Sequence, residues 1–411
     1  MADSEKITMR VLMVNYEYPP LGGGGGVIAR DIVEELAARG HEIIVLTSGF
    51  EGLPTVERVD DRLEIHRVAV WGRKELPTAS LPSMLSFWPL GLRYGRQLIA
   101  EKSFDVVHTH FMVPSGPVGQ TLADRLGVPN VLTLHGGDIY DPTKKNSPHR
   151  RWVLRRLGRR LMTKADAIGC ASRDIIGHAH RFYEPSLEIQ QIPLGIIPTR
   201  PVDASRSEFG IADDRFLMVT TGRLVERKKV DWMLQVMARL DDPRDLLMVL
   251  GSGPKMQEWQ ALAEELGVAD RVQFRGHVSE QEKHKLTQLA DLYTSTTRHE
   301  GFGLVFVEAM DRGVPVVAFD NGGHVDYLED GKTGGVAPLG DIDAFAEKVR
   351  QLKQDPELRR RCAAYVKEKA KLYHIGVCAG RYEQLFEQLV NGPSAKRSLS
   401  TPVDKVAADA A

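Results

Sequence analysis

The chain has 411 residues, of which 42% are hydrophobic and 27% charged, and its formal net charge is −1. This length allows two or three domains with proper cores, and the balanced charge gives no sign of a nucleic-acid partner. Cys170, Cys362 and Cys378 are too widely spaced to suggest a disulfide framework or a metal site. No apolar run suits a signal peptide or a membrane span, so we expect a cytoplasmic protein.

The first half of the chain alternates strand-like and helix-like segments. A helix is expected at residues 27–38, ending at Gly40, and further helices fit between most of the strands. This alternation predicts an α/β fold with a parallel, doubly wound, Rossmann-like sheet. The expected strands are residues 10–16, 42–47, 63–68, 105–109, 130–134, 167–170 and 188–192.

Residues 193–203 contain three prolines and a glycine, which predicts a linker between two domains. The alternation then resumes, with strands expected at residues 216–220, 246–250, 271–274, 292–294 and 314–318. Helices are expected at residues 228–240, 255–266, 280–289, 304–312, 341–353, 356–372 and 377–389.

We therefore expect two Rossmann-like domains that face each other across a cleft. The first covers residues 1–195, and the second covers residues 196–375. A C-terminal helix at residues 376–391 could cross back to the first domain, and residues 392–411 read as a disordered tail. Ligands of such sheets bind beyond the carboxyl ends of the strands, so the chemistry should lie in the cleft.

The motif RHEGFGLVFVEAMDRGVPVVAFDNGG spans residues 298–323 and follows an expected strand. Its glycines let a ligand approach the backbone, and the first amides of the next helix are free donors that suit a phosphate. These amides belong to Phe302, Gly303 and Leu304. Glu300 and Glu308 flank them and suit hydrogen bonds from sugar and ribose hydroxyls. Either glutamate alone would read as an ordinary helix charge, but the whole string favours a donor site.

The string EGFGLVFVE resembles the E-x7-E signature of the retaining glycosyltransferases of family 4, which have the two-domain GT-B fold. TGRLVERKK, residues 221–229, is similar to the family's G-R-L-x-x-x-K-G element, with Lys229 where the family usually has glycine. The resemblance implies that the first domain forms the acceptor side and that the second binds the nucleotide sugar. The resemblance implies that Arg223 and Lys228 bind the donor diphosphate. Two fixed cations would neutralise a pyrophosphate and stabilise it as a leaving group.

LTLHGGD, residues 132–138, lies at the end of an expected strand. The resemblance implies that His135 contacts the transferred sugar, and that Asp138 touches the acceptor hydroxyl or the sugar. A lone histidine at a strand end is more often structural, but the flanking glycines favour the functional interpretation. With Arg223, Lys228 and Glu300, His135 completes the expected catalytic set.

A glycine run at residues 22–26 can wrap a phosphate, and the resemblance assigns Gly22, Gly23 and Gly24 to the donor phosphates and the acceptor side. A nicotinamide site is excluded, because the third glycine of G-x-G-x-x-G and the acidic residue after the second strand are both missing. In the family, strand-end loops such as those of Gly251, Gly253 and Val278 hold the base and ribose. Asp326, in NGGHVD, would reach a ribose or a structural partner.

Residues 144–164 contain nine Lys and Arg and no acid. Arg151, Arg155 and Arg159 share one helical face and Leu154, Leu157 and Leu161 another, a pattern that suits an anionic membrane surface. A core-facing helix with a solvated basic side is an equal alternative. Residues 81–94, rich in aromatic and apolar side chains, read as an acceptor loop or a lipid-facing loop.

The predicted activity is retaining transfer of a hexosyl group from a UDP- or GDP-sugar to a hydroxyl acceptor, without a metal or cofactor. The acceptor could be a glycan, a lipid-linked sugar or a small polyol, and the protein could sit peripherally on the inner face of the membrane. The alternatives are an epimerase or phosphorylase on the same fold, and a non-catalytic nucleotide-sugar-binding subunit. The sequence leaves the sugar, base, acceptor and oligomeric state open.

Overall fold

The first half of the chain forms a sheet whose strands are short runs rich in Val, Ile and Leu. The computed structural model describes residues 8–76 and 78–392. Eight strands pair in the order β3-β4-β2-β1-β5-β6-β7-β8, and all neighbours are parallel except β3 and β4. The strands are β1 (Arg10–Asn15), β2 (Glu42–Ser48), β3 (Val56–Arg58), β4 (Leu63–Val68), β5 (Val106–His110), β6 (Asn130–Leu134), β7 (Ala167–Cys170) and β8 (Gln190–Gln191).

Helices cover both faces of this sheet, which is why its strands read as continuous apolar runs rather than alternating ones. On β1, Val11 and Met13 pack in one core with α1, whereas Leu12 and Val14 pack in a second core with α2 and α3. The helices of this lobe are α1 (Gly24–Ala38), α2 (Leu81–Glu101), α3 (Ser115–Leu126), α4 (Trp152–Lys164) and α5 (Arg173–Phe182).

Helix α2 corrects one expectation, because residues 81–94 are helical rather than a loop. Ser80 caps the helix through a reciprocal capping box with Ser83, an arrangement that satisfies the free amides of the first turn. Phe87 and Leu98 are buried in the core beside α3. Pro89 lies inside the helix. Of the helices in the described ranges, none joins enough length to enough hydrophobicity to traverse a bilayer.

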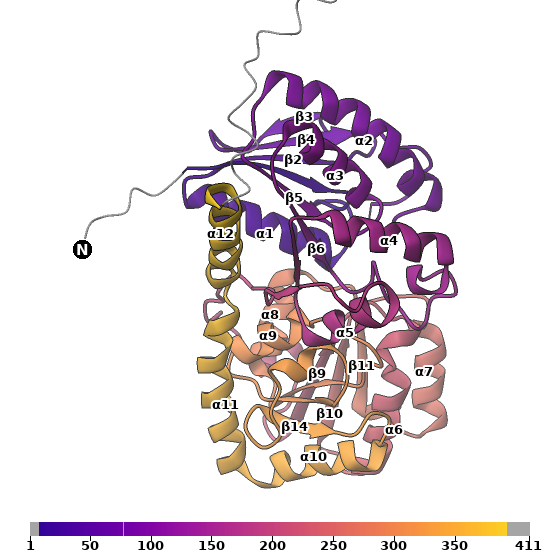
Figure 1. Ribbon diagram of the computed structural model, residues 1–411. Coiled ribbons are helices and arrows are strands. Elements are labelled where there is room, and N and C mark those ends of the chain that lie inside the picture. Colours follow the sequence, from indigo (N-terminus) through magenta and orange to yellow (C-terminus); the bar gives the residue numbers. More distant parts are fainter. Residues whose placement is uncertain (1–7, 77, 393–411) are drawn as a thin grey trace, which may run out of the picture.

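The second lobe repeats the architecture with six parallel strands in the order β11-β10-β9-β12-β13-β14. The strands are β9 (Phe216–Thr221), β10 (Asp245–Leu250), β11 (Val272–Gly276), β12 (Leu292–Ser295), β13 (Val316–Phe319) and β14 (Gly334–Ala337). The helices are α6 (Val230–Leu240), α7 (Met256–Glu265), α8 (Glu280–Leu289), α9 (Leu304–Asp311), α10 (Ile342–Gln354) and α11 (Pro356–Ala370). The chain therefore has the GT-B fold, in which two Rossmann-like lobes face each other (Figure 1).

The last helix, α12 (Ile375–Asn391), leaves the second lobe and packs beside α1 of the first lobe (Figure 1). Its Tyr382 and Phe386 are buried in the α1 core, and Glu383 binds Arg39 at 2.8 Å and His41 at 3.0 Å. A C-terminal helix thus completes the N-terminal lobe.

The chain crosses between the lobes twice, and the two crossing segments lie side by side. Ile196 and His374 form a parallel bridge. The amide of Ile196 donates to the carbonyl of Tyr373 at 2.9 Å, and the amide of Ile375 donates to the carbonyl of Ile196 at 2.7 Å. Two crossing segments, joined by backbone hydrogen bonds, therefore connect the lobes.

Candidate active site

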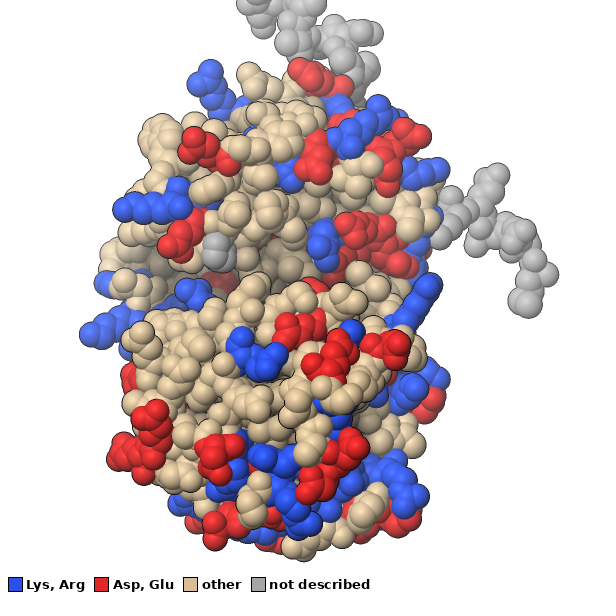
Figure 2. Space-filling view, turned by 180° about the vertical axis from the view of Figure 1, so that it is seen from behind, with Lys and Arg blue, Asp and Glu red and all other residues tan. Residues whose placement is uncertain are grey.

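The site is built where the loops after β6 and β12 meet, at the carboxyl ends of the two sheets. A Cβ on Gly301 would lie 3.1 Å from the carbonyl oxygen of His135, and a Cβ on Gly136 would lie 3.5 Å from the Cα of Gly301. The Ser172 hydroxyl donates to the carbonyl of Gly301 at 2.7 Å. Glycine at both positions lets the two loops touch backbone to backbone, and Figure 2 shows the hollow between the two halves of the molecule. His135 and Glu300 therefore lie on the two loops that meet at the base of the cleft, and we call this region the active-site floor.

Glu300 is a largely buried carboxylate held by two cations. Lys228 Nζ lies 2.7 Å and Arg227 Nη1 lies 3.3 Å from the same oxygen, Oε2. Burial raises the pKa of Glu300, but Lys228 and Arg227 outweigh it and bring the pKa down to about 2. Glu300 is thus ionised at neutral pH, and it fixes the position of Lys228.

The start of α9 offers free backbone donors next to this pair. Gly303 has a φ of 88° and precedes the first helical residue, Leu304. Within the described chain, the amides of residues 302–304 have no backbone acceptor, which leaves the positive end of the helix open to an anion. The Phe302 ring is buried beside Tyr327, so only its backbone can serve a ligand.

Glu308, predicted to bind a hydroxyl, lies on α9 and forms an ion pair with Lys283 of α8 at 3.0 Å. The Lys283 side chain is 13% exposed, and it also pairs with Glu280 at 2.6 Å. Sequence reasoning missed Lys283 because this residue comes from another helix, α8. A ligand hydroxyl at Glu308 would share the carboxylate with this lysine.

Arg223 differs from Lys228 in its surroundings. It is exposed, and its side chain has no hydrogen-bond or ion-pair partner among the described residues. Arg227, four residues further along the chain, lies beside Glu300. Arg223 is therefore a free cation near the site rather than part of its ion-pair cluster.

The glycines of the neighbouring loop are needed for packing inside the protein. A Cβ on Gly251 would lie 2.1 Å from the carbonyl oxygen of Gly222, and one on Gly253 would lie 2.3 Å from that of Leu224. Gly251 also has a φ of 133°, which strongly favours glycine. These glycines shape the loop that carries Arg223. Val278 is half-buried and packs against the core.

His135 ends a buried chain of hydrogen bonds. Its Nε2 lies 2.9 Å from Nδ1 of His110, whose Nε2 lies 3.4 Å from Nδ1 of His108. His108 Nε2 lies 2.9 Å from the Thr133 hydroxyl, which lies 3.0 Å from the Tyr382 hydroxyl on α12. Burial lowers the pKa of His108 to about 3 and of His135 to about 4. The rings are therefore neutral at pH 7.

The donor and acceptor of each hydrogen bond in this chain can be assigned by starting at Tyr382. The buried Tyr382 hydroxyl has Thr133 as its hydrogen-bond partner, with no second acceptor in the described part of the chain, so it donates to Thr133. Thr133 then donates to His108, and each ring donates to the next through Nδ1. This order leaves the remaining proton of His135 on Nδ1, so that its Nδ1–H is a donor.

Asp138 fixes the His135 loop from inside. Its Oδ1 accepts from the amide of His135 at 3.0 Å, and its Oδ2 accepts from the amide of Met112 at 2.8 Å. Burial raises the pKa of Asp138 to about 6, although these amides act in the opposite direction. Both oxygens serve the protein's own backbone, so the geometry gives Asp138 a positioning role, whereas the sequence suggested contact with substrate.

The glycine run lies against the same floor. Gly23 precedes α1, which begins at Gly24 rather than at the expected residue 27, and the amide of Gly22 donates to the carbonyl of Leu76 at 3.1 Å. A Cβ on Gly25 would lie 2.4 Å from the Phe111 ring, and that ring lies 4.3 Å from the His135 ring. The start of α1 thus connects to His135 through one aromatic side chain.

Asp326 links the lobes. Its Oδ2 accepts from the amide of Arg173 at 2.8 Å and from the Gln191 side chain at 2.7 Å, and its Oδ1 accepts from Arg173 Nε at 2.9 Å. Of the two roles suggested by the sequence, ribose ligand and structural partner, the structure supplies the second.

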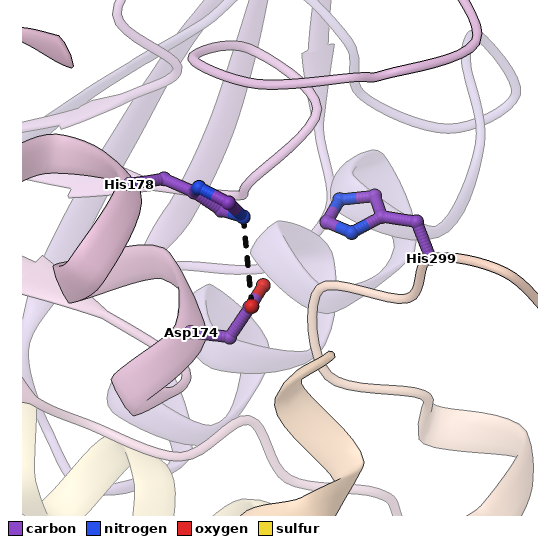
Figure 3. A group of neighbouring side chains, drawn as sticks. All are labelled: Asp174, His178 and His299. Carbon is purple, nitrogen blue, oxygen red and sulfur yellow. Dashed lines mark ion pairs between the residues drawn. The ribbon is translucent and has the colours of Figure 1, made fainter. Parts of the chain in front are cut away.

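Three side chains near Glu300 could hold a metal ion. Asp174 and His178 lie one turn apart on α5, and His299 comes from the other lobe; their ligand atoms all lie within 4.8 Å of one another. Figure 3 shows both rings beside the carboxylate, and Tyr140 stacks on His178 at 3.6 Å. Burial lowers the pKa of His178 to about 4, so its ring is neutral and able to coordinate. Sequence reasoning missed this group because its members come from both lobes.

The basic helix α4 uses its leucines inside the protein. Leu161 is buried, and Leu157 packs against the same core. The exposed side carries the arginines together with Trp152, 75% exposed, and Val153, 54% exposed. The leucine stripe therefore does not form a lipid-facing surface, contrary to the membrane interpretation of the pattern.

Comparison with known proteins agrees with this architecture. Residues 23–195 match the glycosyl transferase 4-like domain, and residues 201–369 match the glycosyl transferases group 1 family. N-acetyl-alpha-D-glucosaminyl L-malate synthase of Bacillus anthracis is 28% identical over 368 residues, 85% of this chain and 90% of that protein. EpsD of Bacillus subtilis, named as a glycosyltransferase, is 30% identical over 321 residues, 72% of this chain and 82% of that protein.

Solved structures share the fold. Sucrose-phosphate synthase of Thermosynechococcus elongatus superposes with a TM-score of 0.82 at 22% identity, covering 93% of this chain and 99% of that one. HepE of Anabaena, solved in complex with UDP, gives a TM-score of 0.74 at 20% identity, covering 93% and 100%. The two lobes and the site at their junction define a glycosyltransferase. The chain belongs to the GT-B glycosyltransferases of family 4.

Proposed function

We propose that the protein transfers a hexosyl group from a UDP- or GDP-sugar to a hydroxyl acceptor, with retention at the anomeric carbon and without a catalytic metal. The observation that carries this proposal is the buried Lys228–Glu300 pair beside the free amides of α9. A diphosphate placed there would receive a fixed cation and helix amides, the groups that stabilise a departing phosphate. Among relatives, one is named as GDP-mannose-dependent, and HepE was solved with UDP.

The state of two carboxylates near His135 argues against a covalent intermediate. Both oxygens of Asp138 accept from backbone amides, and the charge of Glu300 is balanced by Lys228 and Arg227, which both bind its Oε2. Asp138 is therefore not free to attack the sugar, and Glu300 is a weak nucleophile. We infer a front-face reaction, in which the leaving diphosphate takes the proton of the acceptor hydroxyl. His135 Nδ1–H would donate to the sugar, and Glu300 would accept from one of its hydroxyls.

The test is a donor screen with product analysis. The purified protein is incubated with UDP-glucose, UDP-N-acetylglucosamine and GDP-mannose, with and without malate, inositol or a glycan acceptor. Release of nucleoside diphosphate is followed, and the anomeric configuration is read by NMR. We expect one donor to be consumed faster with an acceptor and the product to keep the donor's configuration. An inverted product contradicts the mechanism, and binding without turnover of any donor favours a non-catalytic subunit.

We also infer peripheral contact with an anionic membrane through the exposed side of the first lobe. Trp152 and Val153 of α4 are exposed, and so are three apolar side chains of α2: Leu81 is 69%, Leu85 64% and Trp88 42% exposed. Apolar side chains beside arginines suit the interface of anionic lipids. Flotation with phosphatidylglycerol vesicles should carry the wild type but not a Trp152→Ser, Leu85→Ser variant; equal flotation of the two removes this surface from the proposal.

A further inference from the structure

A guanidinium is buried without a partner in the loop between β4 and α2. The Nε, Nη1 and Nη2 atoms of Arg73 are all buried and have no hydrogen-bond partner in the described chain. Its Cζ lies 5.0 Å from the centre of the Tyr16 ring. A ring face offsets only part of the cost of removing a cation from water, so this charge requires an anion.

Other arginines in the protein do not share this condition. Arg39 binds Glu35 and Glu383, and Arg206 binds Asp291 at 2.8 Å. Arg67 and Arg312 each have one buried nitrogen without a partner, but other nitrogens of the same side chains are bonded. Arg73 is the one arginine of the described ranges with all three nitrogens buried and unpaired. A structural role would have supplied a carboxylate or carbonyl.

The loop that carries Arg73 is fixed beside the active-site floor. The carbonyl of Leu76 accepts from the amide of Gly22 at 3.1 Å, and Ser86 accepts from the amide of Trp71 at 3.0 Å. Tyr16 comes directly after β1, at the carboxyl end of the sheet, and its hydroxyl lies 2.6 Å from that of Ser83. Arg73 therefore lies at the cleft end of the first lobe.

The same edge of the lobe carries the uncapped start of α1. No side chain caps this helix, and the amides of Gly24 and Gly25 have no backbone acceptor in the described part of the chain. The carboxylate of Glu17 accepts a hydrogen bond from the amide of Gly23 at 3.2 Å. Arg73 and the free α1 amides, the latter next to the Glu17 carboxylate, thus lie at one edge of the first lobe, whereas the Lys228 cluster belongs to the second.

We propose that Arg73 binds an anionic group on the acceptor, so that the acceptor is a hydroxyl compound bearing a carboxylate or a phosphate. This inference rests on the proposed function only in calling the ligand an acceptor. A guanidinium matches the two oxygens of either group through paired hydrogen bonds. The position fits, because the start of α1 reaches His135 through Gly25 and Phe111. The anionic group would anchor the acceptor while its hydroxyl faces the transferred sugar.

Binding is measured by calorimetry on protein saturated with UDP, so that the donor-phosphate site is filled. The probes are L-malate, D-inositol 3-phosphate, inorganic phosphate and neutral myo-inositol, which separate carboxylate from phosphate and anion from polyol. We expect one of the anions to bind at least about tenfold more tightly than myo-inositol, a difference typical of a charge-assisted pair. Raising the ionic strength should weaken it.

Three variants test whether the effect belongs to Arg73. Arg73→Gln should weaken anion binding by at least about tenfold, whereas Lys74→Gln, which removes an exposed neighbouring charge, should not. Arg73→Lys keeps the charge and should bind with intermediate affinity, which separates loss of charge from loss of fold. UDP binding should be the same in all of them.

Equal anion affinity in Arg73→Gln and wild type overturns the proposal. Failure of the protein to bind any of the anionic probes also overturns it. Where UDP does not bind, the measurement is repeated with GDP. Failure of both nucleotides to bind, with an Arg73-dependent anion site still present, contradicts the proposed function and leaves the anion site standing. Arg73-dependent binding of inorganic phosphate alone, with neither organic anion bound, refutes the assignment to an acceptor.

Discussion

Replacing either member of the Lys228–Glu300 pair should lower both the unfolding free energy and the transfer activity. The two side chains are 14% and 16% exposed and lie 2.7 Å apart. Removing one partner of such a pair leaves an uncompensated buried charge, at a cost of about 3–5 kcal/mol. Arg227 stays 3.3 Å from Glu300, so Lys228→Met should lie at the lower end, about 3 kcal/mol.

The pKa of Glu300 gives an independent magnitude. It falls from 4.5 to about 2, and at about 1.4 kcal/mol per unit this corresponds to about 3 kcal/mol. Because the folded pKa lies below the unfolded one, this contribution is fully present above pH 4.5 and is lost as the pH falls toward 2. The two routes agree on the size of the effect.

A double-mutant cycle with urea unfolding at pH 7 measures it. Lys228→Met and Glu300→Gln should each lower the unfolding free energy by about 3 kcal/mol, and the double variant should recover to within about 1–2 kcal/mol of the wild type, because the unpaired charge is gone. All three should lose transfer activity. Lys332→Met, which removes an exposed lysine of the same lobe, is the control. Additive losses in the double variant, or a Lys228→Met midpoint equal to the wild type, would refute the reasoning.

Three further predictions concern the buried histidines, the proton order and the metal. His108 and His135 have pKa values lowered to about 3 and 4 by burial; their contribution to stability is present above pH 6.5 and falls as the pH drops toward 4, by about 2 kcal/mol each at pH 5. Equal urea midpoints at pH 7 and pH 5 would contradict it. Tyr382→Phe removes the first donor of the chain, so it should lower kcat about tenfold or more with little change in KM, whereas a wild-type kcat would show that the proton order does not matter. EDTA should leave transfer unchanged; a loss that divalent ions restore would assign a required metal to Asp174, His178 and His299.

Much of the fold could be predicted because its strands are buried on both faces. The apolar runs at residues 63–68, 130–134 and 167–170 correspond to β4, β6 and β7 without adjustment. Strand β3, exposed at the edge, and the glycine-containing β14 carried no such signal. The segment of α2 was misread as a loop from its aromatic and apolar side chains, whereas Ser80 and Pro82 start a helix.

The site was predictable where one motif holds all of its parts. Glu300 and the α9 amides belong to one string, and Lys228 has the reach to meet them. The role of Arg227 depends on a turn of the loop, which spacing does not reveal. The links from His135 to Tyr382, and from Asp174 to His299, join segments more than a hundred residues apart, so only the fold brings them together.

The return of α12 to the first lobe separates the order of synthesis from the order of folding. The core between α1 and the first sheet stays incomplete until Cys378, Tyr382 and Phe386 of α12 pack into it. These residues are made only after the whole second lobe. A nascent N-terminal half would therefore expose an apolar surface to chaperones, and a fragment that ends at the linker would be prone to aggregate. Only a chain made to its last helix can complete the hydrogen-bond chain that ends at His135, because its far end is the Tyr382 hydroxyl.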